Sequence, residues 1–250
     1  MNNAKTTVQR WLARGWKPAA LAIAVLGLAV ATSTVQAGRN VNPGVLPPQS
    51  HAYGMSCGNW GAEWWKWVYS FPADQNPVTD PTGEIGTLSQ SGPVWFLAGT
   101  FGQTVQRTIT IPAGKAIFFP LYNIWNDYPC PDPGFQPAPG QSLYDFLRIG
   151  AAGYIDPNVI MAAEVDGVPL LNLSAYRAVS GPDVTVFTGD PSWASMNMDP
   201  CVTGTPQVAV ADGYWIMLAP LKPGQHTIHF SAEAWAGTFN LDVTYYITVQ

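Results

Sequence analysis

The C-terminal part of the chain, residues 208–249, contains the pattern that most restricts the fold. Short segments rich in β-branched and aromatic residues follow one another there, separated by the turn-forming pairs Asp212-Gly213 and Pro223-Gly224. Such segments favour strands, because branched and aromatic side chains pack well on a pleated surface. Strands that recur every ~8–15 residues with turns between them are typical of an antiparallel β-sandwich, either Ig-like or jelly-roll-like. We therefore predict a mainly β protein.

Earlier segments extend this pattern. Residues 93–100 and 116–121 are continuous apolar runs, which indicate buried strands. Residues 104–111 alternate between apolar and polar positions, and Arg107 is the exception on the apolar side. Two further segments flank an Asp-Gly pair, which favours a two-residue hairpin turn: 158–165 and 168–173.

Two segments have helical periodicity instead. After Ser56, which can cap a helix, one helical face collects Trp60, Trp64, Trp67, Val68 and Phe71. We interpret the three tryptophans of this face as packing residues, whereas Trp65 falls outside it. A second helix is predicted after Ser142, where Asp145 completes a capping box. The expected fold is thus a sandwich with two packed helices.

The N-terminal residues have the features of a cleavable secretory signal peptide. A basic stretch ends at Lys17, an apolar run follows, and Val35 and Ala37 are small residues suited to signal peptidase. The apolar run is shorter than the ~20 residues of a spanning helix, which favours cleavage over the alternative of an uncleaved anchor. We expect a secreted or periplasmic protein with three parts: a signal peptide at 1–37, a flexible leader at 38–52 and a single β-rich domain at 53–250.

Removal of the signal peptide makes the protein strongly acidic. Four of the 11 Lys and Arg residues lie in it, which leaves 7 basic against 16 acidic residues and a net charge of −9. A protein so poor in cations lacks the groups that displace counterions from phosphate, which argues against nucleic-acid binding. Anionic lipids would repel it as well, so we expect no membrane partner after cleavage.

Three cysteines remain in a compartment that permits disulfides. Cys130 and Cys201 both lie in loops rich in Pro and Asp, whereas Cys57 lies beside the first predicted helix. We predict a Cys130–Cys201 disulfide with Cys57 left over, and the alternative is three reduced, buried thiols.

Several segments are distinctive enough to suggest a family. These are residues 54–67, 91–102, 111–123, 211–215 and 224–230. In these segments the chain resembles a family of secreted bacterial proteins of uncharacterised function, so the resemblance implies export but no activity. Members often have a Cys shortly before the Gly-Pro-Val-Trp segment and another in the strand before Pro-Ala-Gly. The chain has Ile85 and Gly86 at the first place and Ile109 at the second, so no bridge of that type is expected.

The leading functional hypothesis is a non-enzymatic binding or surface-assembly module. Its concrete form is a sandwich whose exposed rings stack on a glycan or another envelope component, with Trp65, Trp125 and Trp193 as the candidate ligand-binding residues. A purely structural envelope protein is another possibility. The sequence contains no phosphate-binding loop and no His-Glu-x-x-His motif.

An enzyme is the alternative. A hydrolase acting on extracellular polysaccharide would need two carboxylates in a cleft. Glu63, Glu164 and Glu233 are the candidate catalytic residues, because they lie among apolar or aromatic neighbours, where burial can raise a pKa. We predict no cofactor and no catalytic metal, although acids in the loops could bind a structural Ca²⁺: Asp127, Asp132, Asp190 and Asp199.

Overall fold

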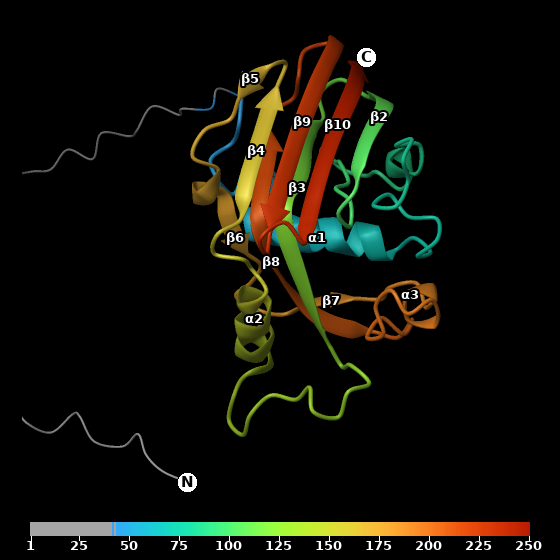
Figure 1. Ribbon diagram of the computed structural model, residues 1–250, viewed down its shortest axis with the longest axis vertical. Coiled ribbons are helices and arrows are strands. Elements are labelled where there is room, and N and C mark those ends of the chain that lie inside the picture. Colours follow the sequence, from blue (N-terminus) through green and yellow to red (C-terminus); the bar gives the residue numbers. More distant parts are fainter. Residues whose placement is uncertain (1–41, 43) are drawn as a thin grey trace, which may run out of the picture. The chain divides into compact units, whose positions relative to one another are not determined.

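Two five-stranded sheets form the body of the protein in the computed structural model, which describes residue 42 and residues 44–250 (Figure 1). The central sheet contains β1 (Val94–Phe96), β3 (Ala116–Tyr128), β8 (Gln207–Leu218) and β6 (Arg177–Val179), with β7 (Thr185–Phe187) also paired to β8. The outer sheet has the order β2 (Thr104–Ile111), β10 (Phe239–Val249), β9 (Gly224–Ala234), β4 (Ile160–Val165) and β5 (Val168–Pro169). The predicted mainly β sandwich is therefore confirmed.

The pairing within the sheets is mixed, and not purely antiparallel as predicted. β1 runs parallel to β3, and β2 runs parallel to β10, whereas the other pairs are antiparallel. Each parallel pair lies at an edge of its sheet. The predicted turn at Asp212-Gly213 is wrong, because both residues lie inside β8. There the buried Asp212 carboxylate accepts two hydrogen bonds from Arg177, at 2.9 and 2.7 Å.

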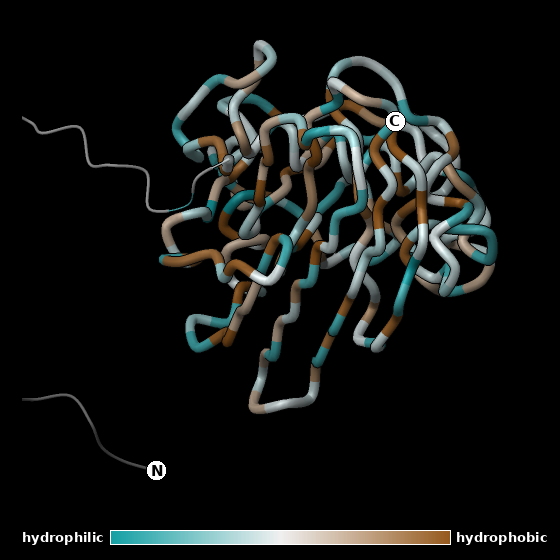
Figure 2. Tube along the Cα trace, turned by 90° about the horizontal axis from the view of Figure 1, so that it is seen from above, coloured by the Kyte–Doolittle hydropathy of each residue, from teal (hydrophilic) through white to brown (hydrophobic). Residues whose placement is uncertain are grey.

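Alternate residues of the central sheet contribute to two different cores. On β8, Ile216 and Leu218 pack against the outer sheet, whereas Trp215 and Met217 pack against α1 (Cys57–Tyr69). The central sheet thus lies between the outer sheet and α1. The outer sheet buries one face only, and Figure 2 shows hydrophobic and hydrophilic residues interleaved along the strands, as one-sided burial requires.

The predicted helix after Ser56 is confirmed as α1, and the Ser56 side chain accepts a hydrogen bond from the Asn59 N–H. The interpretation of its apolar face is confirmed as well, since Trp60, Trp64 and Trp67 are all buried. Each of these three indole N–H groups donates to a backbone carbonyl, at 2.9, 2.9 and 3.1 Å respectively. Burial of these large rings holds α1 on the central sheet.

The second predicted helix is α2 (Leu143–Gly153), which Ser142 caps as expected. It packs against the part of β3 and β8 that extends beyond the outer sheet (Figure 1). A third helix, α3 (Ser192–Ser195), is a single turn in the loop before β8. The hairpin at Asp166-Gly167 is also confirmed, as the connection between β4 and β5.

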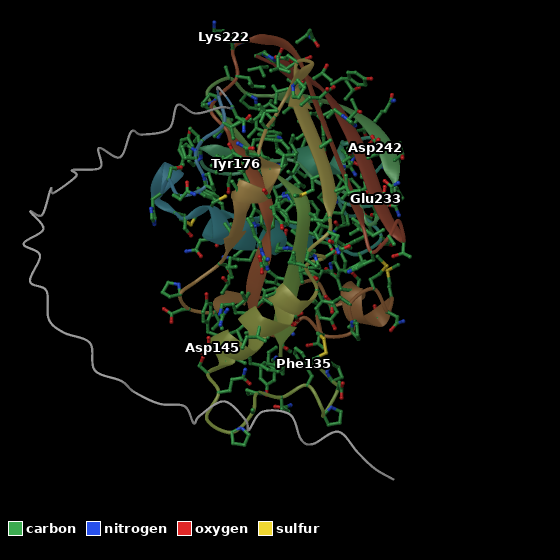
Figure 3. All side chains as sticks on the ribbon, turned by 60° about the vertical axis from the view of Figure 1, so that its left-hand side comes forward. Phe135, Asp145, Tyr176, Lys222, Glu233 and Asp242 are labelled. Atoms are coloured by element: carbon green, nitrogen blue, oxygen red, sulfur yellow. A yellow bond between two sulfur atoms is a disulfide. The ribbon has the colours of Figure 1, made fainter. Side chains whose placement is uncertain are left out.

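The predicted disulfide joins Cys130 to Cys201 (Figure 3). It ties the loop after β3 to the loop before β8, which start from neighbouring strands. Cys57 is free and buried, and its burial raises the pKa of the thiol to about 12. The Cys57 thiol is therefore protonated and unreactive at neutral pH.

The predicted signal peptide at 1–37 lies outside the described residues. The prediction of a flexible leader is wrong for residues 44–46, because they are packed along the edge of the central sheet. Val45 is 1% exposed and bridges to Leu218, and the Leu46 N–H donates to the Met217 carbonyl at 2.8 Å. Among the described residues, no helix combines the length and the apolar character needed to cross a bilayer.

Candidate functional site

A pocket of about 70 Å³ opens where α1, β3, β10 and the loops around β1 and β2 meet. We call it the Trp65 pocket. Its lining consists of Trp64, Trp65, Val78, Gly99, Thr100, Phe101, Pro120, Tyr122, Asn123, Phe239 and Leu241. Five of these side chains are aromatic, so the pocket offers rings together with a few polar groups, as small-molecule sites usually do.

A β-bulge in β3 positions two of the lining residues. Pro120 pairs with Trp215 and Tyr122 with Tyr214, so Leu121 is the extra residue in the ladder. A bulge reverses the alternation of side chains beyond it. Leu121 and Tyr122 consequently both contribute to the core between the sheets, and Trp125 packs with the rings on the α1 side.

Two of the lining residues each have a buried polar atom without a hydrogen-bond partner in the described part of the chain: the indole Nε1 of Trp65 and the side-chain Oδ1 of Asn123. One is a donor and the other is an acceptor. A buried polar group without a partner costs about 1–3 kcal/mol, so such groups need an explanation. The other three tryptophans of α1 donate to backbone carbonyls, which makes the unused Trp65 N–H an exception.

Two exposed rings adjoin this pocket. Phe101 belongs to the lining and is 41% exposed, and Trp235, in the turn between β9 and β10, is 46% exposed. The Trp235 ring lies 6.0 Å from that of Tyr122 and 6.3 Å from that of Phe239, measured between centroids.

The backbone at Trp235 adopts an unusual conformation. Its φ of +50° is in the left-handed region that bulky residues rarely occupy. The carboxylate of Asp156 accepts a hydrogen bond from the Trp235 N–H and holds the turn. Strain of this kind persists only where the surroundings enforce it, and it is concentrated at functional sites.

The three predicted ligand-binding tryptophans gather around one residue, Tyr69, but they are not exposed as expected. Trp65 is 7% exposed, Trp193 is 1% exposed and Trp125 is half-buried. Ring centroids of Trp65, Trp125 and Trp193 lie 5.3, 6.2 and 4.8 Å from that of Tyr69. Trp193 also donates its N–H to the Phe71 carbonyl at 3.0 Å, so its role is packing. Of the three, only Trp65 lines the pocket.

The three predicted catalytic glutamates do not converge. Glu63, on α1, pairs with Lys66 at 2.8 Å, on the other side of the central sheet from the remaining two. Glu164 lies opposite His229, and Glu233 lies opposite Ile160, on the same pair of strands. These positions are four residues apart, roughly 13 Å along the strands, beyond the spacing of paired catalytic carboxylates. Glu233 lies on the outer surface, on the same side of the molecule as Asp242 (Figure 3).

A pair of carboxylates does occur elsewhere. Asp127, at the end of β3, and Asp199 have carboxylate oxygens within 4.8 Å of each other. The Tyr69 hydroxyl donates to Asp199 at 2.7 Å. Burial, followed by the neighbouring Asp199 charge, raises the pKa of Asp127 to about 8. Asp127 is 5% exposed, whereas Asp199 is partly exposed, so one carboxylate of the pair is closed to solvent.

Of the four acids predicted to gather Ca²⁺, the structure therefore brings together two. Asp132 is exposed and accepts a hydrogen bond from the Gly134 N–H in its own loop. Asp190 accepts one from the Ser192 N–H at the start of α3. Both are turn-forming residues, and neither belongs to the Asp127–Asp199 cluster.

Sequence reasoning missed most of the pocket. Tyr122 and Asn123 follow a continuous apolar run, which has no alternation of apolar and polar residues that could reveal the bulge. Phe101 and Trp235 lie in segments that look like ordinary turns. Pro120 was the available signal, because proline within a buried strand is confined to edges and bulges.

No protein-family model matches the chain, and no curated protein is similar to it. Two solved structures resemble parts of it. One is the cysteine protease inhibitor EhICP2 from Entamoeba histolytica, with 14% identity over 63% of this chain and 96% of the inhibitor, at a TM-score of 0.23. The other is PbICP-C, solved in complex with falcipain-2, with 15% identity over 64% of this chain and all of PbICP-C, at a TM-score of 0.23. Likeness at this level carries no inference about function.

Proposed function

We propose that this protein is an exported binding module that recognises N-acetylated sugars of an envelope or extracellular glycan, with the acetamido group in the Trp65 pocket. The observation that carries the proposal is that two residues of an aromatic lining each have a buried polar atom without a partner, Trp65 Nε1 and Asn123 Oδ1. An acetamido group has one carbonyl to accept from an indole N–H and one N–H to donate to an amide oxygen. Its methyl group matches the apolar part of the lining.

The size of the pocket agrees with a substituent and not with a whole sugar. About 10–15 Å³ holds one water molecule, so a pocket of about 70 Å³ accommodates a group of several non-hydrogen atoms. The pyranose ring would then lie outside, against the exposed rings of Phe101 and Trp235. Aromatic side chains offer a large apolar surface and lose little conformational entropy on binding, which suits them to stacking on a sugar ring.

The proposal retains the hypothesis of export and drops the hypothesis of a hydrolase. Export is supported by the features of the first 37 residues and is compatible with the disulfide. The hydrolase required two of Glu63, Glu164 and Glu233 to share a cleft, whereas Glu63 lies on the other side of the central sheet and the other two are roughly 13 Å apart along their strands. The Asp127–Asp199 pair does not replace them, because the buried Asp127 carboxylate is not accessible to a polymer.

The test is a titration of the protein without residues 1–37 by N-acetylglucosamine oligomers, with glucose oligomers of equal length as the matched ligand control. We expect binding of the acetylated oligomers and at least tenfold weaker binding of the glucose oligomers, because the two unpartnered atoms would remain unsatisfied. Equal affinity for both, or no binding of either, would contradict the proposal. Screening on a glycan array identifies other N-acetylated sugars that fit better.

A variant of the exposed Trp235 ring tests whether this side chain contacts the sugar. We expect Trp235→Ala to weaken binding of the acetylated oligomers about tenfold, since one stacking contact contributes on the order of 1 kcal/mol. Tyr246→Ala serves as the control, because Tyr246 is similarly exposed, at 43%, on the outer face of β10. Calorimetric dissociation constants for the two variants check this, and an equal loss in both would show that the effect is unspecific.

A further inference from the structure

His226 lies at the end of the outer sheet, between a turn and a loop. It has the same parity along β9 as the buried Ile228 and Phe230, so its ring points toward the interior, and its side chain is 15% exposed. The ring Nδ1 is 2.8 Å from the carboxylate Oδ2 of Asp166, in the turn between β4 and β5. The ring Nε2 is 2.8 Å from the carbonyl oxygen of Lys222, in the loop between β8 and β9. The ring therefore connects two segments that are distant in the sequence.

Both partners of the His226 ring are hydrogen-bond acceptors. A neutral imidazole has one N–H, so it could donate to one of them and would turn a lone pair toward the oxygen of the other. An imidazolium has two N–H groups and can donate to both. The Asp166 carboxylate supplies the opposite charge, and hydrogen bonds between ionised groups are stronger than those between neutral groups. The arrangement is thus fully satisfied when His226 is protonated.

The charged residues beside His226 come from the turn and the loop. Asp166 faces the ring from the turn, Lys222 in the loop is exposed, and β10 places the apolar Ile247 opposite His226. Burial lowers the pKa of His226, but the hydrogen bonds to Asp166 and to the Lys222 carbonyl, together with the Asp166 charge, outweigh the effect of burial. The pKa of His226 is therefore raised above its ordinary value of 6.5.

The two connected segments also hold their neighbours. Asp166 Oδ1 accepts a hydrogen bond from the Thr227 N–H at 2.9 Å, which fixes the turn to β9. The loop begins at Ala219, whose N–H donates to the Gly44 carbonyl at 2.8 Å, so the N-terminal segment of the described chain lies against it. A neutral His226 would keep its N–H toward the charged Asp166, because that bond is the stronger one. The contact with the Lys222 carbonyl would then be lost.

We propose that His226 is a proton-controlled latch that joins the β4–β5 turn to the β8–β9 loop when protonated and releases the loop when neutral. A group whose pKa is raised by folding stabilises the fold fully below its unfolded pKa, which is about 6.5 for histidine. This stabilisation is lost as the pH rises through the raised pKa of the folded protein. The latch is therefore closed at mildly acidic pH and opens as the pH rises. It is independent of the sugar-binding proposal, because none of its residues lines the Trp65 pocket.

The experiment combines an NMR titration of the imidazole protons with amide hydrogen exchange, on the protein without residues 1–37. We expect His226 to titrate with a midpoint above 6.5. At about pH 6, the Ala219 amide should exchange about fivefold faster in His226→Gln than in the wild type, because a charge-assisted hydrogen bond is missing. At about pH 8.5, the two rates should agree within about twofold, because the wild type has lost the same proton. Comparing the proteins at one pH removes the intrinsic pH dependence of exchange.

His229→Gln is the matched control. His229 is on the outer face of the same strand and contacts Asp242 at 3.1 Å, so its replacement should leave the exchange of the Ala219 amide unchanged at both pH values. Asp166→Asn tests the charge, because asparagine tolerates the left-handed backbone at this position, where φ is +52°. We expect the titration midpoint of His226 to fall in this variant.

Two results would overturn the proposal. One is a His226 midpoint at or below 6.5 in the wild type, a measurement that needs no variant to fold. The other is a ratio of Ala219 exchange rates, between His226→Gln and the wild type, that is the same at both pH values. In that case the ring would have a packing role that does not depend on its charge.

Discussion

Replacing Arg107 by alanine is expected to lower the free energy of unfolding by about 3–5 kcal/mol. Arg107 is 1% exposed on β2, and the Nε and one terminal nitrogen of its guanidinium lie within hydrogen-bond distance of four groups in the interior. These are the carbonyls of Asp80, Ala98 and Gly99, at 2.9, 2.7 and 3.2 Å, and the Tyr245 hydroxyl at 2.7 Å. Truncation would remove the donor to the Asp80 and Gly99 carbonyls and would open a cavity.

The same substitution should affect the Trp65 pocket. Ala98 and Gly99 lead directly into Thr100 and Phe101, so their hydrogen bonds to Arg107 fix the segment that lines the pocket. Denaturant unfolding monitored by circular dichroism measures the loss of stability. The stability of Arg107→Lys is expected to fall between those of the wild type and the alanine variant. Lysine keeps the positive charge but lacks the planar guanidinium with its several N–H donors.

Gln106→Ala provides the control for this prediction. Gln106 is the neighbouring residue on β2 and is exposed, so its replacement should change stability by less than about 0.5 kcal/mol. A loss of less than about 1 kcal/mol in Arg107→Ala would show that water replaces the guanidinium. The interior hydrogen bonds of Arg107 would then contribute little to folding.

Gly58→Ala is expected to destabilise the protein by about 3 kcal/mol or more, at the upper end of the range for overpacking. A Cβ on Gly58 would lie 2.0 Å from the carbonyl oxygen of Val179 on β6, a backbone atom that no side-chain rotation can move. Helix α1 would have to move away from the central sheet, and the packing of Trp64 on Trp215 would be lost with it. Denaturant unfolding measures this change.

Gly153→Ala is the matched control, because the same substitution should raise the free energy of unfolding there instead of lowering it. Gly153 ends α2, and a Cβ added to it meets no atom within 4 Å. Alanine loses less backbone entropy in a helix than glycine, so we expect a gain of up to about 1 kcal/mol. If both variants were destabilised equally, the close approach at Gly58 would not be the cause.

Much of the fold could be predicted because it depends on neighbours along the chain. The helix α1 follows from the spacing of Trp60, Trp64 and Trp67 and from the Ser56 cap, all within a few turns. The hairpin at Asp166-Gly167 follows from local turn chemistry. The Cys130–Cys201 disulfide followed from the similar loop surroundings of the two residues.

The candidate site could not be predicted in the same way. Trp65 stood out only as the tryptophan outside the apolar face of its helix, and nothing local indicated that its N–H would have no partner. Trp125 and Trp193 were expected at the surface, and they pack instead around Tyr69. Arg107 was recognisable as an exception on an apolar face, but its hydrogen-bond acceptors come from residues far away in the sequence, such as Tyr245.

The sequence by itself therefore determined the features set by local periodicity: a mainly β fold, two capped helices and the hairpin. Only the tertiary structure decided which side chains meet. The bulge at Leu121 reverses the faces of Asn123 and Trp125, and a single extra residue in a ladder leaves the apolar pattern of β3 unchanged. The physical reason is that a strand's alternation is local, whereas the Trp65 pocket and the Asp127–Asp199 cluster depend on contacts between residues distant in the chain.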